Sequence, residues 1–177
     1  MSVCYLGNGV GDLNIKAECN LLIQTYSIQD CWEYDTNTYN LAPNNALTQI
    51  NGFTFANTGD WEAEWIVKYP QINNRVVLYP SDDSSVFLGV GVNYSSGRNS
   101  MIVYGYGNDK NVGAMTLNTE YTIKMVKEDN SIKVYANDNL IDTRTNISLL
   151  TTSNVNIGLR NWGSGTGTIR NIKVKPL

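Results

Sequence analysis

Residues 61–68 read WEAEWIVK, and this stretch decides the predicted fold. Successive side chains of a β-strand point to opposite faces, so residues two apart share a face. One face of this stretch would carry Trp61, Ala63, Trp65 and Val67, and the other would carry Glu62, Glu64, Ile66 and Lys68. We therefore predict a strand over 61–68 whose tryptophan face lies in the core.

Short runs with the same period of two continue along the chain and are separated by turns rich in Gly, Asn and Asp. They predict strands over 75–79, 86–92, 100–106, 120–127, 132–135, 140–142, 155–159 and 169–174. The links at 128–131 and 137–139 favour two consecutive hairpins, because Asn and Asp tolerate positive φ. The last strand changes phase after Ile169, which predicts a bulge near Asn171. Helix signals are scarce, so the whole pattern indicates an all-β sandwich.

Composition limits the class of protein. With 177 residues the chain fits one domain, and 42% hydrophobic against 16% charged residues argues against intrinsic disorder. The net charge is −3 and Lys and Arg do not cluster, so we expect no nucleic-acid partner. No apolar run approaches the roughly 20 residues of a membrane span, so we expect no membrane insertion. The start, MSVCYLG, lacks the features of a signal peptide, which predicts synthesis in a cytoplasm without general export.

The first part of the chain differs from the rest. We expect an N-terminal segment over 1–45, irregular or strand-containing, with a packing or attachment role, followed by the sandwich over 46–177. Such a segment would anchor the module to a partner or to its own copies, which predicts a homo-oligomer. All three cysteines, Cys4, Cys19 and Cys31, lie in this segment. Their odd number does not suggest a disulfide framework, so we interpret them as reduced, structural thiols.

Nitrogen and sulfur ligands for a metal are few, whereas oxygen ligands are plentiful. The chain has no histidine and no Cys-x2-Cys pair, which argues against zinc. Oxygen ligands for calcium occur at 82–85 and 108–111, but both runs are also typical of hairpin turns. We expect no cofactor and keep calcium as an alternative.

Six stretches together resemble a known superfamily: GDWEAEWIVKY, VFLGVGV, SMIVYGYG, TEYTIKMVKEDNSIKVYANDNLID, VNIGLRNWGSG and GTIRNIKVKPL. Their order and pattern are similar to those of the concanavalin A-like lectin, glucanase and laminin-G-like proteins, over about residues 46–177. The resemblance implies an antiparallel two-sheet jelly-roll sandwich. Modules of this kind occur in viral tail fibres, baseplates and receptor-binding proteins, and in surface adhesins.

The superfamily includes glycoside hydrolases, whose retaining chemistry needs two carboxylates about 5 Å apart. In those enzymes the carboxylates come from Glu-x-Asp-x-x-Glu on one strand. Here Asp60, Glu62 and Glu64 share a face, but the next positions on that face are Ile66 and Lys68, so the downstream carboxylate is absent. We expect no catalysis and keep a hydrolase using Glu62 and Glu64 as an alternative. Triads that need histidine as the base are excluded.

Sugar binding usually combines an exposed aromatic ring that stacks on a pyranose with amide and carboxylate side chains for the hydroxyls. Two places in the later half of the sequence offer this combination, and the candidate residues are Arg160, Asn161 and Trp162, then Tyr104, Tyr106, Asn108 and Asp109. The plain alternative is that the aromatic residues pack at the end of the sandwich or beneath a loop.

The function predicted from these features is a non-catalytic, carbohydrate- or surface-binding module of a virion (tail fibre, baseplate or decoration) or of a cell-surface assembly. Its partners would be a cell-surface glycan or other virion and surface proteins. The alternative from another class is a purely structural capsid or tail protein that binds no sugar.

Overall fold

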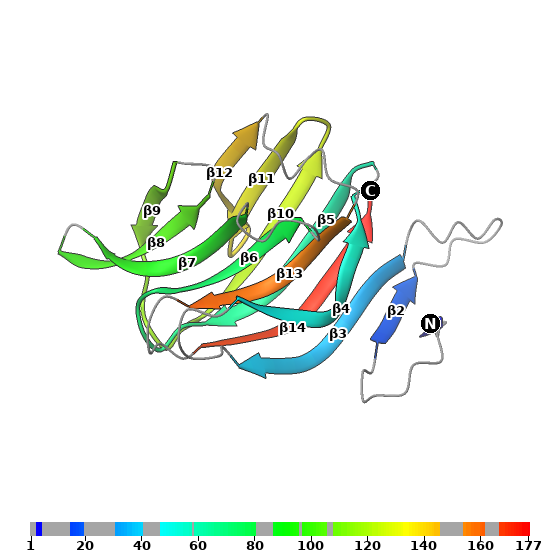
Figure 1. The fold of residues 1–177 in the computed structure, drawn as a ribbon, viewed down its shortest axis with the longest axis horizontal. Coiled ribbons are helices and arrows are strands. Elements are labelled where there is room, and N and C mark those ends of the chain that lie inside the picture. The colour runs from blue at the N-terminus through cyan, green and yellow to red at the C-terminus, as the bar shows by residue number, and fades with distance from the viewer. Residues whose placement is uncertain are drawn as a thin grey trace.

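The computed structural model describes residues 3–4, 15–19, 31–40, 47–57, 59–80, 87–95, 97–105, 108–145, 154–161 and 167–177. Within these ranges all regular secondary structure is β-strand (Figure 1). In the described part of the chain, no helix is long and apolar enough to cross a membrane.

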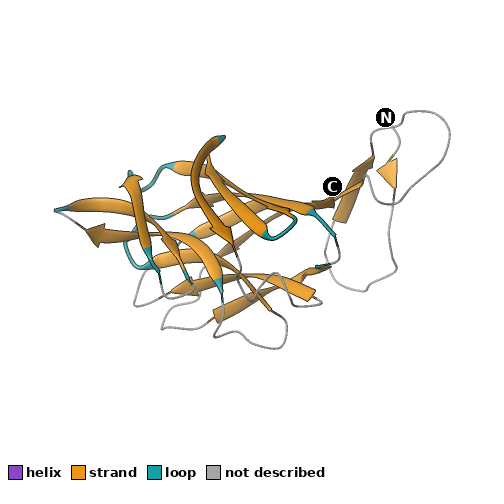
Figure 2. Ribbon diagram, turned by 90° about the horizontal axis from the view of Figure 1, so that it is seen from above, coloured by secondary structure: helices purple, strands orange, loops and turns teal. Residues whose placement is uncertain are grey.

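The described strands form two antiparallel sheets, which Figure 2 shows as two layers. One sheet has eight strands, in the spatial order β1 (Val3–Cys4), β2 (Ile15–Cys19), β3 (Cys31–Asn40), β14 (Thr168–Pro176), β5 (Trp61–Lys68), β10 (Glu120–Glu128), β11 (Ser131–Ala136) and β12 (Asn139–Thr145). The other has six, in the order β4 (Leu47–Ala56), β13 (Asn154–Asn161), β6 (Asn74–Pro80), β7 (Leu88–Ser95), β8 (Arg98–Tyr104) and β9 (Lys110–Ala114). The predicted all-β, two-sheet sandwich is confirmed.

The core lies between the sheets, and β5 contributes as its sequence predicts. Trp61, Ala63, Trp65 and Val67 are each at most 2% exposed, whereas the residues that alternate with them are half-buried on the other face. The Trp61 indole Nε1 donates a hydrogen bond to the buried Asn57 Oδ1 at 2.8 Å. The partners that pack on this face include Ile123, Met125, Ile132 and Val134 from β10 and β11, and Val90, Val103 and Ile157 from the six-stranded sheet.

The predicted hairpins are confirmed. Asp129 has φ 49° in the turn between β10 and β11, and Asn137 and Asp138 have φ 48° and 62° between β11 and β12. The predicted bulge is confirmed as well, because Asn171 has φ 52° and the pairing of β14 with β3 shifts register between Arg170 and Ile172.

One element differs from the sequence-based prediction, and a second gives detail to the predicted strand-containing segment. Residues 108–111 were interpreted as a turn, but Lys110–Ala114 forms β9 and pairs with β8 at the edge of the six-stranded sheet. Polar residues and glycine are common on edge strands, where one side of the backbone faces no other strand, so the composition resembles that of a turn. The second element is β3, which lies within 1–45 and pairs with β14 from Thr168↔Asn40 to Val174↔Glu33. Strand β3 is therefore part of the eight-stranded sheet, and β1 and β2 continue that sheet beyond it (Figure 1).

Candidate functional site

The outer face of the six-stranded sheet, which points away from the core, carries a buried arginine. In β6, Val76 and Leu78 belong to the core, so Arg75, Val77 and Tyr79 lie on the outer face. Outer-face residues of a sandwich usually contact solvent. Here Arg75 is only 3% exposed, and Val77 and Tyr79 are also buried. The outer face therefore holds a charged group in a desolvated environment.

Two glycines of β7 make room for Arg75. Gly89 and Gly91 alternate with core residues of β7, so both lie on the outer face, and Gly91 pairs with Arg75. A Cβ at Gly91 would lie 2.1 Å from a carbonyl oxygen of β6 and 2.6 Å from the Arg75 Cβ. Only glycine fits this position, and the bare backbone of β7 leaves a path between the side chains of β6 and β8.

Arg75 uses this path to reach β8. Its guanidinium carbon lies 4.1 Å from the centroid of the Tyr104 ring and 5.2 Å from that of Phe87. A guanidinium over an aromatic face is attracted by the ring quadrupole, and the attraction strengthens when both groups are desolvated. We call Arg75 and Tyr104 the arginine–tyrosine stack. Burial raises the pKa of the Tyr104 phenol, although Arg75 and a hydrogen bond with Asn93 oppose the shift, so the phenol stays protonated at neutral pH.

The structure places the predicted sugar-binding residues in two groups on this same sheet. Tyr104 is 6% exposed and Arg75 covers its ring, so Tyr104 offers little ring surface to a sugar. Asn108 and Asp109, just after β8, are exposed. At the end of β13, Arg160 and Asn161 occupy the register positions opposite Arg75 and Asn74. Tyr106 and Trp162 lie outside the described residues, so their role stays a prediction.

Arg75 is the residue that sequence reasoning missed. It lies between the group that contains Tyr104 and the group that contains Arg160. It contacts Tyr104 on one side, and its position is in register with Arg160 on the other. A signal was present in VFLGVGV, because two glycines on one face of a strand leave space for a large neighbour. That signal does not say which neighbour fills the space.

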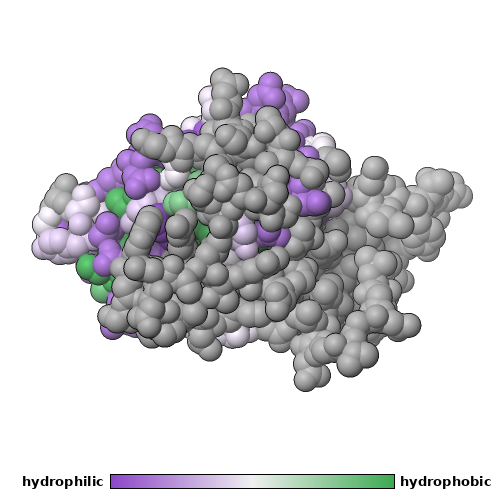
Figure 3. All heavy atoms as spheres, viewed as in Figure 1, coloured by the Kyte–Doolittle hydropathy of each residue, from purple (hydrophilic) through white to green (hydrophobic). Residues whose placement is uncertain are grey.

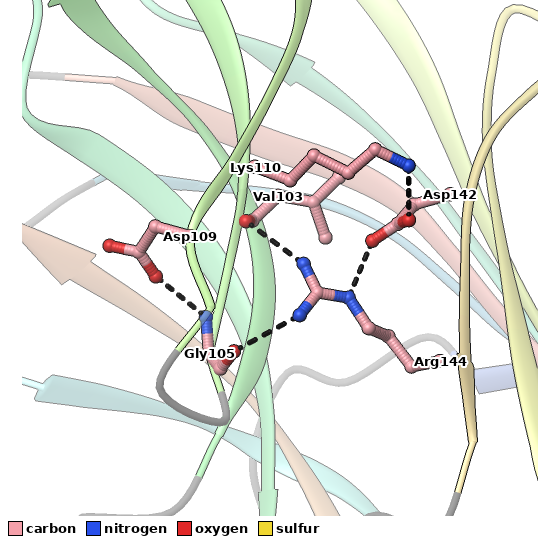
Figure 4. A network of polar contacts seen from close by, with 6 residues as sticks. All are labelled: Val103, Gly105, Asp109, Lys110, Asp142 and Arg144. Atoms are coloured by element: carbon pink, nitrogen blue, oxygen red, sulfur yellow. Dashed lines mark hydrogen bonds and ion pairs between the residues drawn. The ribbon is translucent and has the colours of Figure 1, made fainter.

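A polar bridge of Lys110 from β9 with Asp142 and Arg144 from β12 joins the two sheets at one edge (Figure 4). Arg144 extends from β12 and donates Nε to Asp142, Nη1 to the Gly105 carbonyl at 3.3 Å and Nη2 to the Val103 carbonyl at 3.4 Å. Asp142 also accepts a hydrogen bond from Lys110 Nζ at 2.7 Å.

The polar bridge fixes the segment that carries Asn108 and Asp109. Gly105 accepts from Arg144 and its own N–H donates to Asp109 Oδ1 at 3.0 Å. Gly105 at the end of β8 is therefore held by Arg144 and by Asp109, which fixes the Asp109 side chain next to that strand end.

Glu62 and Glu64, the residues of the hydrolase alternative, lie on the outer face of the eight-stranded sheet and not near this site. Glu64 Oε1 accepts a hydrogen bond from Lys173 Nζ at 2.9 Å, and Glu64 pairs in register with Lys124. Asp60 Oδ1 accepts from the Asp129 N–H at 2.8 Å, so this third carboxylate holds a turn. Nearby, hydrophilic residues gather at the upper edge of Figure 3, where β10 turns into β11 in Figure 1.

Among the described residues no cluster of three or more potential Cys, Asp or Glu ligands could hold a metal ion. Of the two runs considered for calcium, 82–85 lies outside the described residues. In the other, Asp109 accepts from Gly105, Lys110 pairs with Asp142, and Asn111 Oδ1 accepts from the Gly113 N–H at 3.1 Å. Calcium binding stays an untested alternative.

Neither protein-family models nor curated protein sequences match this chain. Solved structures do. The marine PL7 alginate lyase AlyA1 from Zobellia galactanivorans is similar at 18% identity and TM-score 0.54, over 88% of this chain and 84% of the lyase. The carbohydrate-binding module CBM66 from Bacillus subtilis is similar at 12% identity and TM-score 0.52, over 92% of each chain.

The galectin LEC-6 from Caenorhabditis elegans is also similar, at 12% identity and TM-score 0.50, over 78% of this chain and 96% of the galectin. Identities this low establish the fold alone. That fold is a two-sheet jelly-roll sandwich, the fold that the resemblance to the concanavalin A-like proteins implied.

Proposed function

We propose that this protein is a non-catalytic module that binds carbohydrate beside the outer face of its six-stranded sheet, through residues that follow β8 and residues at the end of β13. The observation that carries the proposal is the arginine–tyrosine stack, where a desolvated guanidinium is held over an aromatic ring between the two groups of predicted sugar-binding residues. Polar groups fixed in advance lose little entropy on binding and so favour recognition of hydroxyls and carboxylates. The fold supports the proposal, because it is shared with a carbohydrate-binding module and a galectin.

Burial assigns different roles to the residues. Arg75 and Tyr104 are too buried to offer much surface, so they support the site from beneath. Direct contacts with the sugar come from the exposed Asn108 and Asp109 after β8, and from the Arg160 to Trp162 segment at the end of β13.

The register sets the length of the ligand. Tyr104 aligns through Gly89 and Val77 with Gly158, which is two residues before Arg160 and three strand spacings away. Strands are about 4.8 Å apart and rise about 3.3 Å per residue, so the Cα positions of Tyr104 and Arg160, from which the two groups extend, are about 16 Å apart along the diagonal. A ligand that contacts both groups is therefore an oligosaccharide and not a single sugar.

Glycan-array screening of the full chain, followed by titration of any hit, tests the proposal. We expect Arg160→Ala and Trp162→Ala to weaken binding at least tenfold. Arg170→Ala is the matched control, because Arg170 lies on the outer face of the eight-stranded sheet and pairs with Glu120 there, and it should bind like the wild type. A folded protein that binds no glycan at millimolar concentration, or variants that bind unchanged, would refute the proposed site.

The non-catalytic part of the proposal has its own test. The purified protein is incubated with glucans, galactans and alginate; reducing ends are measured for all three, and unsaturated products are measured for alginate, the polyuronate. We expect neither to form. Cleavage that disappears in Glu64→Gln would establish the hydrolase alternative and overturn this part of the proposal.

We further propose that the module works as a homo-oligomer in a virion or other surface assembly. Weak contacts with a glycan become useful when several copies act together. Supporting this, β1 and β2 extend the eight-stranded sheet past β3 and give the module a surface outside the two-layer core (Figure 1). Light scattering on the full chain should give the mass of an oligomer, and a monomer would contradict this part.

A further inference from the structure

The N-terminal strands bring two cysteines directly opposite each other. Strand β2 pairs with β3 in the antiparallel register from Ile15↔Asp35 to Cys19↔Cys31. Directly opposite residues in such a ladder share a face, and their Cα atoms are about 4.5–5.5 Å apart. A disulfide needs Cα atoms about 4.4–6.8 Å apart. The backbone positions of Cys19 and Cys31 therefore satisfy the distance for a disulfide without any rearrangement of the sheet.

The third cysteine lies on the same face but outside this range. Cys4 in β1 pairs with Ala17, which is two residues before Cys19 in β2, so Cys4 and Cys19 are diagonal neighbours. Diagonal neighbours are about 7–8 Å apart, which is too far for a disulfide in an undistorted sheet. Cys31 is a further strand away from Cys4. The register therefore selects one pair out of the three that three cysteines allow.

We propose that Cys19 and Cys31 form a cross-strand disulfide and that Cys4 remains a free thiol. This replaces the expectation that all three cysteines stay reduced. The oxidant is a low-molecular-weight disulfide. The thiolate of one cysteine attacks it, forming a mixed disulfide and releasing one small thiol, and the second thiolate then displaces the other small thiol. The protein loses two protons and two electrons, and both electrons end on the two released thiols.

The disulfide has a structural consequence that does not depend on sugar binding. Strand β3 is hydrogen-bonded to β14, whose residues Ile169, Ile172 and Val174 belong to the core. Linking Cys19 to Cys31 therefore ties β2 covalently to a strand that is part of the sandwich. Such a bond persists outside a reducing cytoplasm, which suits a module exposed on a surface.

Counting free thiols in the full-length wild-type protein tests the proposal. The protein is incubated with oxidised glutathione or with dithiothreitol, desalted, alkylated and weighed by mass spectrometry. We expect one alkylated cysteine after oxidation and three after reduction. A peptide map without reduction should contain a cross-link between the Cys19 and Cys31 peptides. Cys4→Ser should keep this cross-link, with no thiol left to alkylate.

Denaturation supplies the control for register. In urea the sheet pairing is lost, so oxidation there should also give cross-links that contain Cys4. Three alkylated cysteines after oxidation of the folded protein would overturn the proposal, as would a folded-state cross-link through Cys4. Glutathione adducts on Cys19 and Cys31 without a cross-link, or a bound metal ion that keeps all three thiols reduced, would overturn it too. The decisive measurement uses the wild type, so it does not depend on any variant folding.

Discussion

Asp142→Asn removes the central carboxylate of the polar bridge and should destabilise the fold strongly. The Asp142 side chain is 5% exposed and accepts hydrogen bonds from both Lys110 and Arg144, whose own side chain is 9% exposed. Breaking a buried ion pair by removing one partner costs about 3–5 kcal/mol, because the other charge stays buried. The asparagine oxygen still accepts one hydrogen bond, and Arg144 keeps two carbonyl partners. We therefore expect the free energy of unfolding to fall by about 2–4 kcal/mol.

Lys110→Met is the comparison that tests the reasoning. The Lys110 side chain is 52% exposed, so its pair with Asp142 is screened by water. Removing it should lower the free energy of unfolding by at most about 1 kcal/mol. Urea titration followed by the fluorescence of the core tryptophans measures both variants, and the midpoint should shift at an unchanged m-value. Equal losses for the two variants would refute the claim that burial decides the cost.

The same carboxylate predicts a pH dependence. Burial alone would raise the pKa of Asp142, but hydrogen bonds and charge from Lys110 and Arg144 outweigh it and lower the pKa below its usual value. A carboxyl whose pKa is lower in the folded state stabilises the fold above its unfolded pKa of about 3.9. That stabilisation is lost as the pH falls through the folded pKa. The difference between wild type and Asp142→Asn should therefore be constant from about pH 5 to 8 and shrink below about pH 4. A difference that persists undiminished at still lower pH would contradict this.

Two more pairs of substitutions test the core and the site. Trp61→Phe removes the hydrogen bond to Asn57, so it should lower the free energy of unfolding by about 1–2 kcal/mol more than Trp65→Phe, whose indole N–H has no hydrogen-bond partner among the described residues. Equal losses in thermal unfolding would contradict this. Gly91→Ala should lower the free energy of unfolding by about 1–3 kcal/mol, because the added Cβ overlaps with β6. Gly97→Ala is the comparison. A Cβ there would have no atom within 4 Å, so only the backbone strain of φ +78° should contribute, about 1–2 kcal/mol. If Gly91→Ala is as stable as the wild type, the glycine path for Arg75 is wrong.

The sequence predicted those parts of the fold that depend on local alternation. Strand β5 was predicted with its observed bounds and its core face, because its apolar and polar positions alternate cleanly. The hairpins at β10–β12 were predicted because Asn and Asp mark positions of positive φ. The change of phase after Ile169 located the bulge at Asn171, because one extra residue in a strand moves the later side chains to the other face.

Pairings between distant segments could not be predicted in this way. Nothing in the residues of β3 specifies β14 as their partner. That pairing depends on which strand still has an unpaired side after the rest of the sheet has formed. The outer face of β6 was hidden as well. In residues 74–80, NRVVLYP, apolar residues occupy both faces of the strand. Alternation therefore does not show which face is the core, nor that Arg75 is buried on the outer face. An arginine in a strand is ordinarily interpreted as solvent-facing, and for that reason Arg75 was absent from the predicted site.

The two outer faces of the sandwich differ in a way that bears on which one binds a ligand. On the eight-stranded sheet, Glu64 pairs with Lys173 and Glu120 pairs with Arg170 in partly exposed ion pairs, an arrangement typical of a solvated surface. On the six-stranded sheet, Arg75 is desolvated and stacked on an aromatic ring. Burying a charge destabilises the folded state, and an apolar residue at position 75 would avoid that cost. A binding site, in contrast, requires charged groups held in fixed positions. Polar groups arranged at such a cost are more readily explained by recognition than by stability, and this contrast supports our proposal that the ligand binds beside the outer face of the six-stranded sheet.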